Sequence, residues 1–125
     1  MTNAQAIVDF TSRCTSITVS RSPGGNLVTQ INVEGESKAF GPFAGTVTVT
    51  GGNKGGSWRY EAFAMPADNS RVVGSAEGSY ESVGQTRWRT VGSGSIATDA
   101  AIQHWGLDAE FDFAKHSWNG RLIPI

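Results

Sequence analysis

Two ionisable side chains lie in otherwise apolar segments, where they could act as an acid or a base. Glu61 lies among aromatic residues in "SWRYEAFA" (57–64), and His104 comes directly before Trp105. A carboxyl group removed from water has a raised pKa and can exchange a proton with a bound molecule near neutral pH. Glu61 and His104 are therefore the candidates for catalysis. The alternative for each is a place on the solvated face of its strand.

The chain offers little for nucleophilic, metal or phosphate chemistry. Cys14 is the only cysteine, no histidine stands beside it in a recognised motif, and no G-x-S-x-G turn occurs. Two histidines and one cysteine are too few for a zinc site. The segment "GGNKGG" (51–56) lacks the spacing of a phosphate-binding loop. We therefore expect no metal and no organic cofactor.

Tryptophans and tyrosines are candidates for shaping a ligand cavity, because aromatic rings with one polar tip are common in cavity walls. Some share a face of the same segment, as Trp58 and Tyr60 do. The candidates for ligand binding are Trp58, Tyr60, Tyr80, Trp88 and Trp105. The alternative for each is an ordinary place in the hydrophobic core.

A ligand also needs space, and the segment "VVGSAEGSY" (72–80) would leave it. Between Val72 and Tyr80, every second residue is small: Gly74, Ala76 and Gly78. Small inward-facing residues leave room inside a narrow barrel. They equally allow a large ring or another strand to pack against the backbone. A cavity and a close contact both remain open interpretations of this pattern.

The tripeptide Arg87-Trp88-Arg89 alternates cations with a ring, a pattern that can hold single-stranded nucleic acid by charge and stacking. If residues 83–85 form a hairpin loop, Trp88 faces Tyr80 and Arg87 faces Glu81. The ring and the cations then lie on opposite faces. The net charge of −1 also lacks the basic excess of nucleic-acid-binding domains. We expect no nucleic-acid partner.

Short strands joined by tight turns would position these residues. Sixteen of the 125 residues are glycine, and many stand beside Ser, Thr or Val, a composition typical of strands and turns. Strict alternation over "WGLDAEFDF" (105–113) predicts a half-buried antiparallel strand. If residues 114–117 form the loop after it, Phe113 pairs with Trp118, Phe111 faces Gly120 and Glu110 faces Arg121.

The pattern predicts an all-β fold in which residues 1–125 form a single domain. About eight strands with short connections favour an antiparallel up-and-down barrel, which leaves no exposed sheet edge. A two-sheet sandwich is the alternative. The N-terminal segment 1–13 fits a strand or a helical turn, and we slightly favour a helical turn over residues 4–13.

The C-terminal half resembles a known group of barrels. The stretches "GSAEGSYESVGQTRWRTVGSGS" and "AEFDFAKHSWNGRL" are glycine-bearing amphipathic strands separated by turns. In this they resemble small bacterial β-barrels of calycin or allene-oxide-cyclase-like shape. The resemblance implies a carrier of a ligand, or a cyclase or isomerase of an apolar metabolite. It transfers no catalytic residue, because no family motif is matched, and a shared fold does not fix function.

These observations predict a barrel that takes a small, mostly apolar organic molecule into its lumen and guides its isomerisation or cyclisation by acid–base catalysis. A carrier or sensor that uses the same lumen without chemistry is the first alternative. The second is a homo-oligomeric interaction module, for example a homodimer, in which Phe40 and Phe43 of an exposed loop contact a second copy.

The location of the protein is predicted from two further features. The N-terminus has no basic region followed by a long apolar core, so it does not read as a secretory signal. No apolar run approaches the length of a membrane span. We expect a cytoplasmic protein that does not associate with a membrane.

Overall fold

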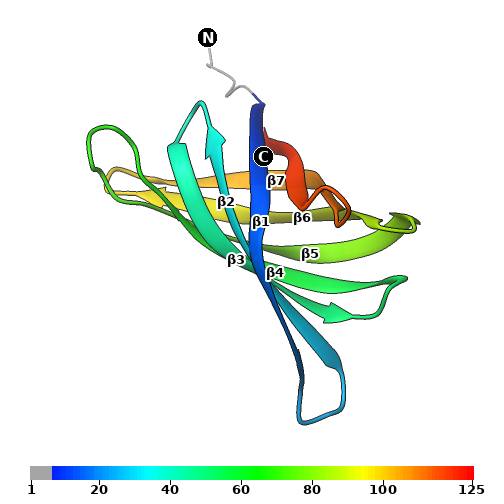
Figure 1. Cartoon of the computed structure of the whole chain (residues 1–125). Helices are drawn as coiled ribbons and strands as arrows, with labels where there is room; N and C mark the ends of the chain where they lie inside the picture. Colours follow the sequence, from blue (N-terminus) through cyan, green and yellow to red (C-terminus); the bar gives the residue numbers. More distant parts are fainter. Residues whose placement is uncertain (1–6) are drawn as a thin grey trace.

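The computed structural model describes residues 7–125, which form a closed barrel of eight antiparallel strands. Each strand pairs with the next along the chain, and β1 pairs with β8 to close the barrel (Figure 1). The up-and-down barrel is confirmed, and the two-sheet sandwich is wrong. The strands are β1 (Val8–Arg21), β2 (Leu27–Ser37), β3 (Gly41–Gly51), β4 (Gly55–Ala64), β5 (Val72–Gly84), β6 (Arg87–Thr98), β7 (Ile102–Asp112) and β8 (Ser117–Pro124).

The first strand replaces the helical turn favoured for the N-terminal segment. From Val8 onward the chain is extended, so that preference is wrong there. Phe10 pairs with Ser37 on one side and Gly120 on the other, and its side chain is buried. Pairing on both edges outweighs a weak local preference for helix. Residues 1–6, which the same prediction covered, lie outside the described residues.

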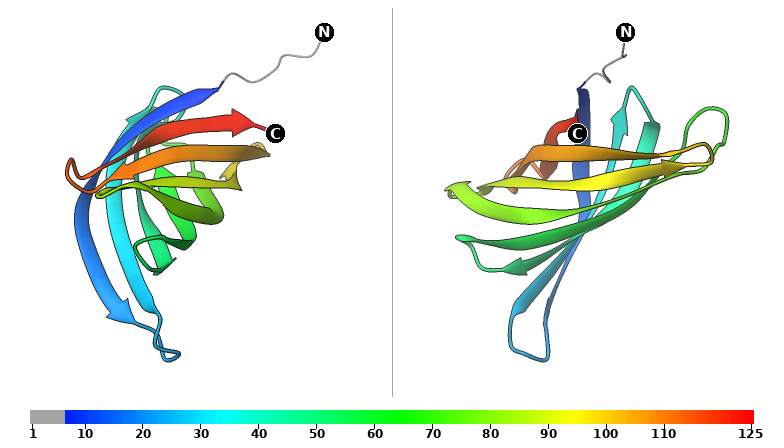
Figure 2. Two further views of the ribbon diagram at one scale, coloured as in Figure 1. Left: turned by 90° about the vertical axis from the view of Figure 1, so that its right-hand side faces the viewer. Right: turned by 180° about the vertical axis from the view of Figure 1, so that it is seen from behind.

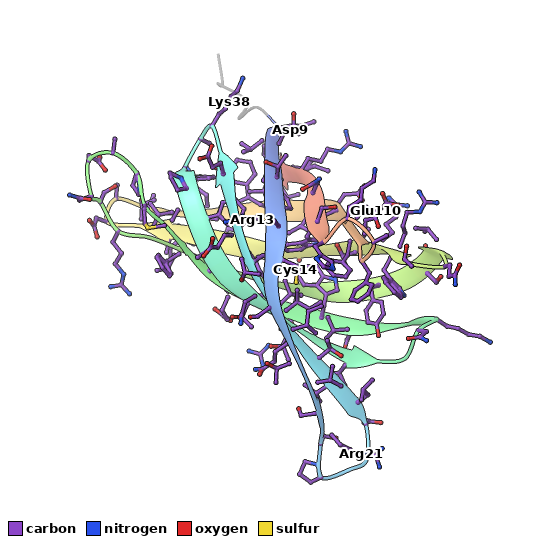
Figure 3. The ribbon with its side chains drawn as sticks, viewed as in Figure 1. Asp9, Arg13, Cys14, Arg21, Lys38 and Glu110 are labelled. Carbon is purple, nitrogen blue, oxygen red and sulfur yellow. The ribbon has the colours of Figure 1, made fainter. Side chains whose placement is uncertain are left out.

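The hairpin of β1 and β2 extends beyond the rest of the barrel. The last pair between β1 and β8 is Arg13 with Ser117, whereas β1 follows β2 as far as the pair of Arg21 with Leu27. The turn 22–26 joins the two strands, and Gly25 adopts a φ of 88°, which glycine tolerates without strain. Figures 2 and 3 show the hairpin projecting from the barrel, with Arg21 near its tip.

The β5–β6 hairpin has the predicted faces but a different register. The strand pairing is interrupted by a bulge between Ser82 and Gly84, and the turn contains only residues 85–86. Tyr80 therefore pairs with Thr90 instead of Trp88. Because the shift is two residues and side chains alternate with a period of two, Trp88 keeps its inward face.

The β7–β8 hairpin is also displaced by two residues from the predicted register. Its loop contains residues 113–116, and His116 ends it with a φ of 50°. Phe111 is therefore the residue that pairs with Trp118, and Arg121 pairs with Asp108 instead of Glu110. The predicted pairs were wrong, and Phe113, predicted on the inward face, lies in the loop and is 46% exposed. The side chains within the two strands keep their faces.

The alternating course of the strands separates the connections into two ends. One end, here called the turn end, carries the four connections 22–26, 52–54, 85–86 and 113–116. The other, the terminal end, carries the start of β1, the end of β8 and the connections 38–40, 65–71 and 99–101. Within residues 7–125, no helix is long and apolar enough to cross a membrane.

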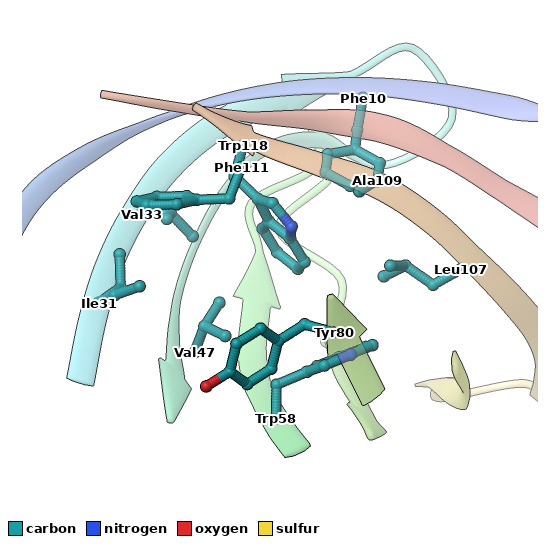
Figure 4. Close-up of a cluster of buried hydrophobic side chains, with 10 residues drawn as sticks. All are labelled: Phe10, Ile31, Val33, Val47, Trp58, Tyr80, Leu107, Ala109, Phe111 and Trp118. Atoms are coloured by element: carbon teal, nitrogen blue, oxygen red, sulfur yellow. The ribbon is translucent and has the colours of Figure 1, made fainter. Parts of the chain in front are cut away.

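Inward side chains from all parts of the barrel wall form a continuous hydrophobic core. Figure 4 shows Trp58 and Tyr80, from the neighbouring strands β4 and β5, on one side of the interior and Trp118 opposite them. Trp58 and Trp118 are among the largest fully buried side chains. The buried cluster contains Phe10, Ile31, Val33, Val47, Trp58, Tyr80, Leu107, Ala109, Phe111 and Trp118.

Candidate functional site

An apolar cavity of about 90 Å³ lies inside the barrel at the terminal end. Five of the seven aromatic residues that line it are Phe10, Phe40, Phe43, Tyr60 and Trp105. The other lining residues are small or aliphatic, apart from three serines, Phe63 and the floor residue Trp118: Ser37, Ala62, Phe63, Ala64, Val72, Gly74, Ser75, Ala76, Gly94, Ser95, Ile96, Leu107, Trp118 and Leu122. The cavity can therefore hold an apolar molecule and offers it few polar partners.

The small residues of β5 produce the cavity at one end and a close contact at the other. A Cβ atom added to Gly74 would have its nearest neighbour at 3.6 Å, an ordinary contact distance. In contrast, Gly78 pairs with Trp58 on one side and Gly92 on the other. A Cβ on Gly92 would lie 2.8 Å from Cζ2 of Trp58. Both interpretations of the glycine pattern therefore hold, each for a different part of the strand.

Phe40 and Phe43 line the cavity and are half-buried, so the prediction that they lie exposed in a loop is wrong. Phe40 meets the indole of Trp105 edge to face, with ring centres 6.2 Å apart. Phe43 meets Phe10 in the same way at 6.1 Å. Gly41 allows the tight turn between the two phenylalanines, because its φ of 81° suits glycine. The only sequence signal was the presence of two large rings in a very short connection.

The chain around Phe40 is fixed at two points. The Phe40 backbone N–H donates to Oγ of Ser37 at 3.0 Å. The Met65 backbone N–H donates to the Pro42 carbonyl oxygen at 2.7 Å, which ties the start of β3 to the β4–β5 connection. Phe63, which is 51% exposed, lies at the edge of the same cavity.

Trp118 forms the floor of the cavity and separates it from the packed turn end. Its ring meets Phe10, Tyr60 and Trp58 edge to face, with centres 5.3, 5.0 and 6.2 Å apart. Its Nε1–H donates to Oγ1 of Thr90 at 3.0 Å, and Thr90 is itself buried. The Ser12 hydroxyl donates to the Trp118 carbonyl oxygen. The sequence indicated a partner strand for Trp118 but gave no sign of this role.

Three of the five predicted ligand-binding residues lie at the turn end, away from the cavity. Trp58 is 1% exposed, and its Nε1–H donates to the Ser79 carbonyl oxygen at 2.9 Å. The Tyr80 hydroxyl donates to the Gly52 carbonyl oxygen at 2.8 Å. The Trp88 Nε1–H donates to the carbonyl oxygen of Asn53 at 2.7 Å. Tyr80 and Trp88 thus hold the turn 52–54 against the end of the barrel.

The other two predicted ligand-binding residues, Tyr60 and Trp105, line the cavity. Tyr60 is the only ionisable side chain among the described residues of the lining. Burial raises the pKa of its phenol well above the ordinary value of 10.0. Tyr60 therefore stays protonated at neutral pH and can donate a hydrogen bond, but it cannot act as a base.

Trp105 differs from the other tryptophans in its hydrogen bonding. The residue is 4% exposed, and its Nε1–H has no acceptor within the part of the chain that the structure describes. Buried N–H groups nearly always have an acceptor, so this one needs an explanation.

The predicted catalytic residues Glu61 and His104 lie on the outer wall, and both are exposed. They occupy one row across four strands, in which Glu61 pairs with Ser75, Ser75 with Ser95, and Ser95 with His104. Three strand spacings separate their backbones by about 14 Å. The structure therefore keeps both out of the cavity, although they border the same open groove on the outer wall. The sequence already indicated that both side chains face outward. Glu61 is adjacent to the inward Tyr60 and His104 to the inward Trp105, and adjacent residues of a strand lie on opposite faces.

The arginines beside Trp88 also lie on the outer wall, as predicted from the alternation. Arg89 bonds Asp108 with both ends of its guanidinium, at 3.0 and 3.1 Å, and Arg87 lies 3.5 Å from Glu110. The hydrogen bond from Arg89 lowers the pKa of Asp108. The ring of Trp88 packs inward against the core. Cations and ring are on opposite faces, so they form no common stacking surface.

Within residues 7–125, no group of three or more His, Cys, Asp or Glu side chains is arranged to hold a metal. No family model, curated protein or solved structure matches the chain. The closed eight-stranded antiparallel barrel is consistent with a calycin-like fold. The functional assignment therefore depends on the cavity itself.

Proposed function

We propose that this protein binds a small, mostly apolar organic molecule in the cavity at the terminal end and carries or senses it without changing it. The observation that carries the proposal is the lining of that cavity, in which aromatic, aliphatic and glycine residues predominate. Apolar concave sites with few polar groups are typical of small-molecule binding.

The size of the cavity limits the ligand. An apolar cavity of roughly 150 Å³ stays dry and binds benzene or xenon. The present cavity is smaller, about 90 Å³, so by proportion the buried part of the ligand should have about four non-hydrogen atoms. A longer molecule would leave its remainder at the edge of the cavity, beside Phe63.

Carriage is favoured over isomerisation or cyclisation because the lining lacks a base. Proton transfer needs a group within hydrogen-bonding reach of the reacting atom. Among the described residues that line the cavity, only Tyr60 ionises, and its raised pKa keeps it protonated. Glu61 and His104, the groups that the catalytic hypothesis needs, are on the other side of the wall.

Filling the cavity tests the proposal. Gly74→Val places three carbon atoms in the cavity, at a position where a Cβ atom already has room. Ser79→Val is the matched control, because it adds valine to the same strand at an exposed, outward position. Binding of methylenecyclopentane, an apolar probe of six carbons, is followed through the methyl resonances of Ile96 and Leu122, which line the cavity.

We expect saturable binding to the wild type and to Ser79→Val, and at least tenfold weaker binding to Gly74→Val. An organic compound extracted from protein purified from its own cells, and absent from Gly74→Val, would extend the result to the native ligand. Failure of the probe to bind the wild type, or equal affinity for the wild type and Gly74→Val, would contradict the proposal.

A further inference from the structure

The interior tryptophans differ in one respect that bears on the ligand. The indole N–H groups of Trp58, Trp88 and Trp118 all donate hydrogen bonds, of 2.9, 2.7 and 3.0 Å. The indole N–H of Trp105 donates no hydrogen bond to any described residue, although this side chain is buried to the same extent as the residues of the hydrophobic core. A buried donor without an acceptor destabilises the folded protein, and an acceptor brought by a ligand would remove that cost.

The paired neighbours of Trp105 bring no side-chain acceptor to its indole. On the adjacent strands it pairs with Gly94 and Pro124, and neither has a side chain that can accept a hydrogen bond. The ring that meets its indole is that of Phe40. Trp105 lines the cavity with its ring, but its Nε1 atom has almost no solvent-accessible surface, so a bound oxygen reaches this N–H when a neighbouring side chain moves aside.

We propose that the ligand is an apolar molecule with one uncharged acceptor oxygen, such as a ketone, an aldehyde or an ether, and that this oxygen accepts a hydrogen bond from Nε1–H of Trp105. The inference rests on the proposed function, because it concerns the molecule held in the same cavity. A carboxylate does not fit, since the described residues of the lining include no lysine or arginine.

A pair of probes that differ only at the acceptor tests this inference. Cyclopentanone and methylenecyclopentane have nearly the same shape, but only the ketone can accept a hydrogen bond. The wild type should bind the ketone about tenfold more tightly than the hydrocarbon. Trp105→Phe keeps a ring in the wall and removes the donor, so it should lose this preference and still bind the hydrocarbon.

The indole proton of Trp105 gives a second readout that requires no variant. In ¹H–¹⁵N spectra, its resonance should move downfield when cyclopentanone binds, as expected for a newly hydrogen-bonded N–H. Methylenecyclopentane, which only contacts the ring, should shift the resonance without this downfield displacement. This measurement decides the question even if Trp105→Phe does not fold.

The outcomes separate the two proposals. If both probes bind the wild type equally and shift the indole proton in the same way, the acceptor inference is overturned and the cavity proposal stands. If neither probe binds, the proposed function itself fails. A preference for the ketone that persists in Trp105→Phe would assign the acceptor to another donor and would also overturn the inference.

Discussion

The two ends of this barrel are built from the same kinds of residue and have opposite interiors. At the turn end, Trp58 packs over Gly78 and Gly92, and its polar tip is bonded to a backbone oxygen. At the terminal end, Trp105 and Phe40 line a cavity, and the indole N–H of Trp105 has no acceptor within residues 7–125. Aromatic content is therefore not what makes a ligand site.

The residues that face the rings make the difference. On β4 and β5 the paired small inward residues Ala62 and Gly74 line the cavity, and a Cβ atom on Gly74 would meet no ring. At the turn end, the indole of Trp58 lies against Gly92. Space inside a barrel is left where small residues on neighbouring strands coincide and no ring reaches them.

The largest effect should come from removing a ring of the packed end. Trp58→Ala should lower the free energy of unfolding by about 3–5 kcal/mol, because it leaves a large void in a close-packed region. Phe40→Ala, the control at the terminal end, should cost about 1 kcal/mol, since its side chain is only half-buried beside existing space. Denaturant unfolding measures both values, and equal losses would contradict the distinction between the two ends.

Two glycine substitutions sharpen the same comparison. Gly92→Ala should destabilise the protein by about 1–3 kcal/mol, because its Cβ would collide with the ring of Trp58 and with backbone atoms of Glu77. Gly74→Ala should instead stabilise it by about 0.4–1 kcal/mol, because the unfolded chain loses freedom and the folded chain has room. Thermal unfolding of both variants is the test, and a loss at Gly74 as large as that at Gly92 would argue against the cavity.

Tyr60 predicts how stability responds to alkaline pH. Its folded-state pKa is raised above the unfolded value of 10.0, so the folded protein retains a proton that the unfolded chain releases. Stability should therefore be unaffected by this group below about pH 10 and should fall above it, by at most about 1.4 kcal/mol per pH unit. Burial raises the pKa of Tyr80 in the same direction, so Tyr80 contributes to the fall.

Unfolding curves between pH 9 and 11 for the wild type, Tyr60→Phe and Tyr80→Phe separate the two groups. Tyr60→Phe should remove most of the alkaline fall and Tyr80→Phe a smaller part. An unchanged slope in Tyr60→Phe would show that the phenol at the cavity wall is accessible to water when folded.

The smallest effects should come from the outer wall. Glu61→Gln and His104→Ala should change the affinity for cavity ligands by less than twofold, because neither side chain lines the cavity. Each should alter the free energy of unfolding by no more than about 0.5 kcal/mol. The same titrations check this, and loss of binding or of any turnover in either variant would revive the catalytic hypothesis.

The fold was readable from the sequence because alternation is a strong signal. Alternation identified the inward face of β7, from Trp105 to Phe111. This assignment of faces stayed correct although the predicted registers of two hairpins were wrong. Each error was two residues, caused by a bulge at Val83 and by a loop that begins at Phe113, and a shift of two leaves faces unchanged. Local alternation cannot reveal a bulge, since the bulge depends on how the hairpin fits its neighbours.

The site was only partly readable. Tyr60 and Trp105 were found because they are large and inward, but Trp58 and Tyr80 share these properties and lie at the other end. Which rings share an end depends on the stagger of strands around the closed barrel, which no single segment contains. Phe40 was missed because its place in the wall depends on how a connection folds over the end of the barrel.

The most direct test of the two-ended interior uses the four tryptophan indoles as reporters. Trp105 and Trp118 border the cavity, whereas Trp58 and Trp88 lie at the turn end. When methylenecyclopentane is added and ¹H–¹⁵N spectra are recorded, we predict saturable shifts of the Trp105 and Trp118 indole resonances and none of the other two. Shifts of Trp58 and Trp88, or no shift of any indole, would contradict the account.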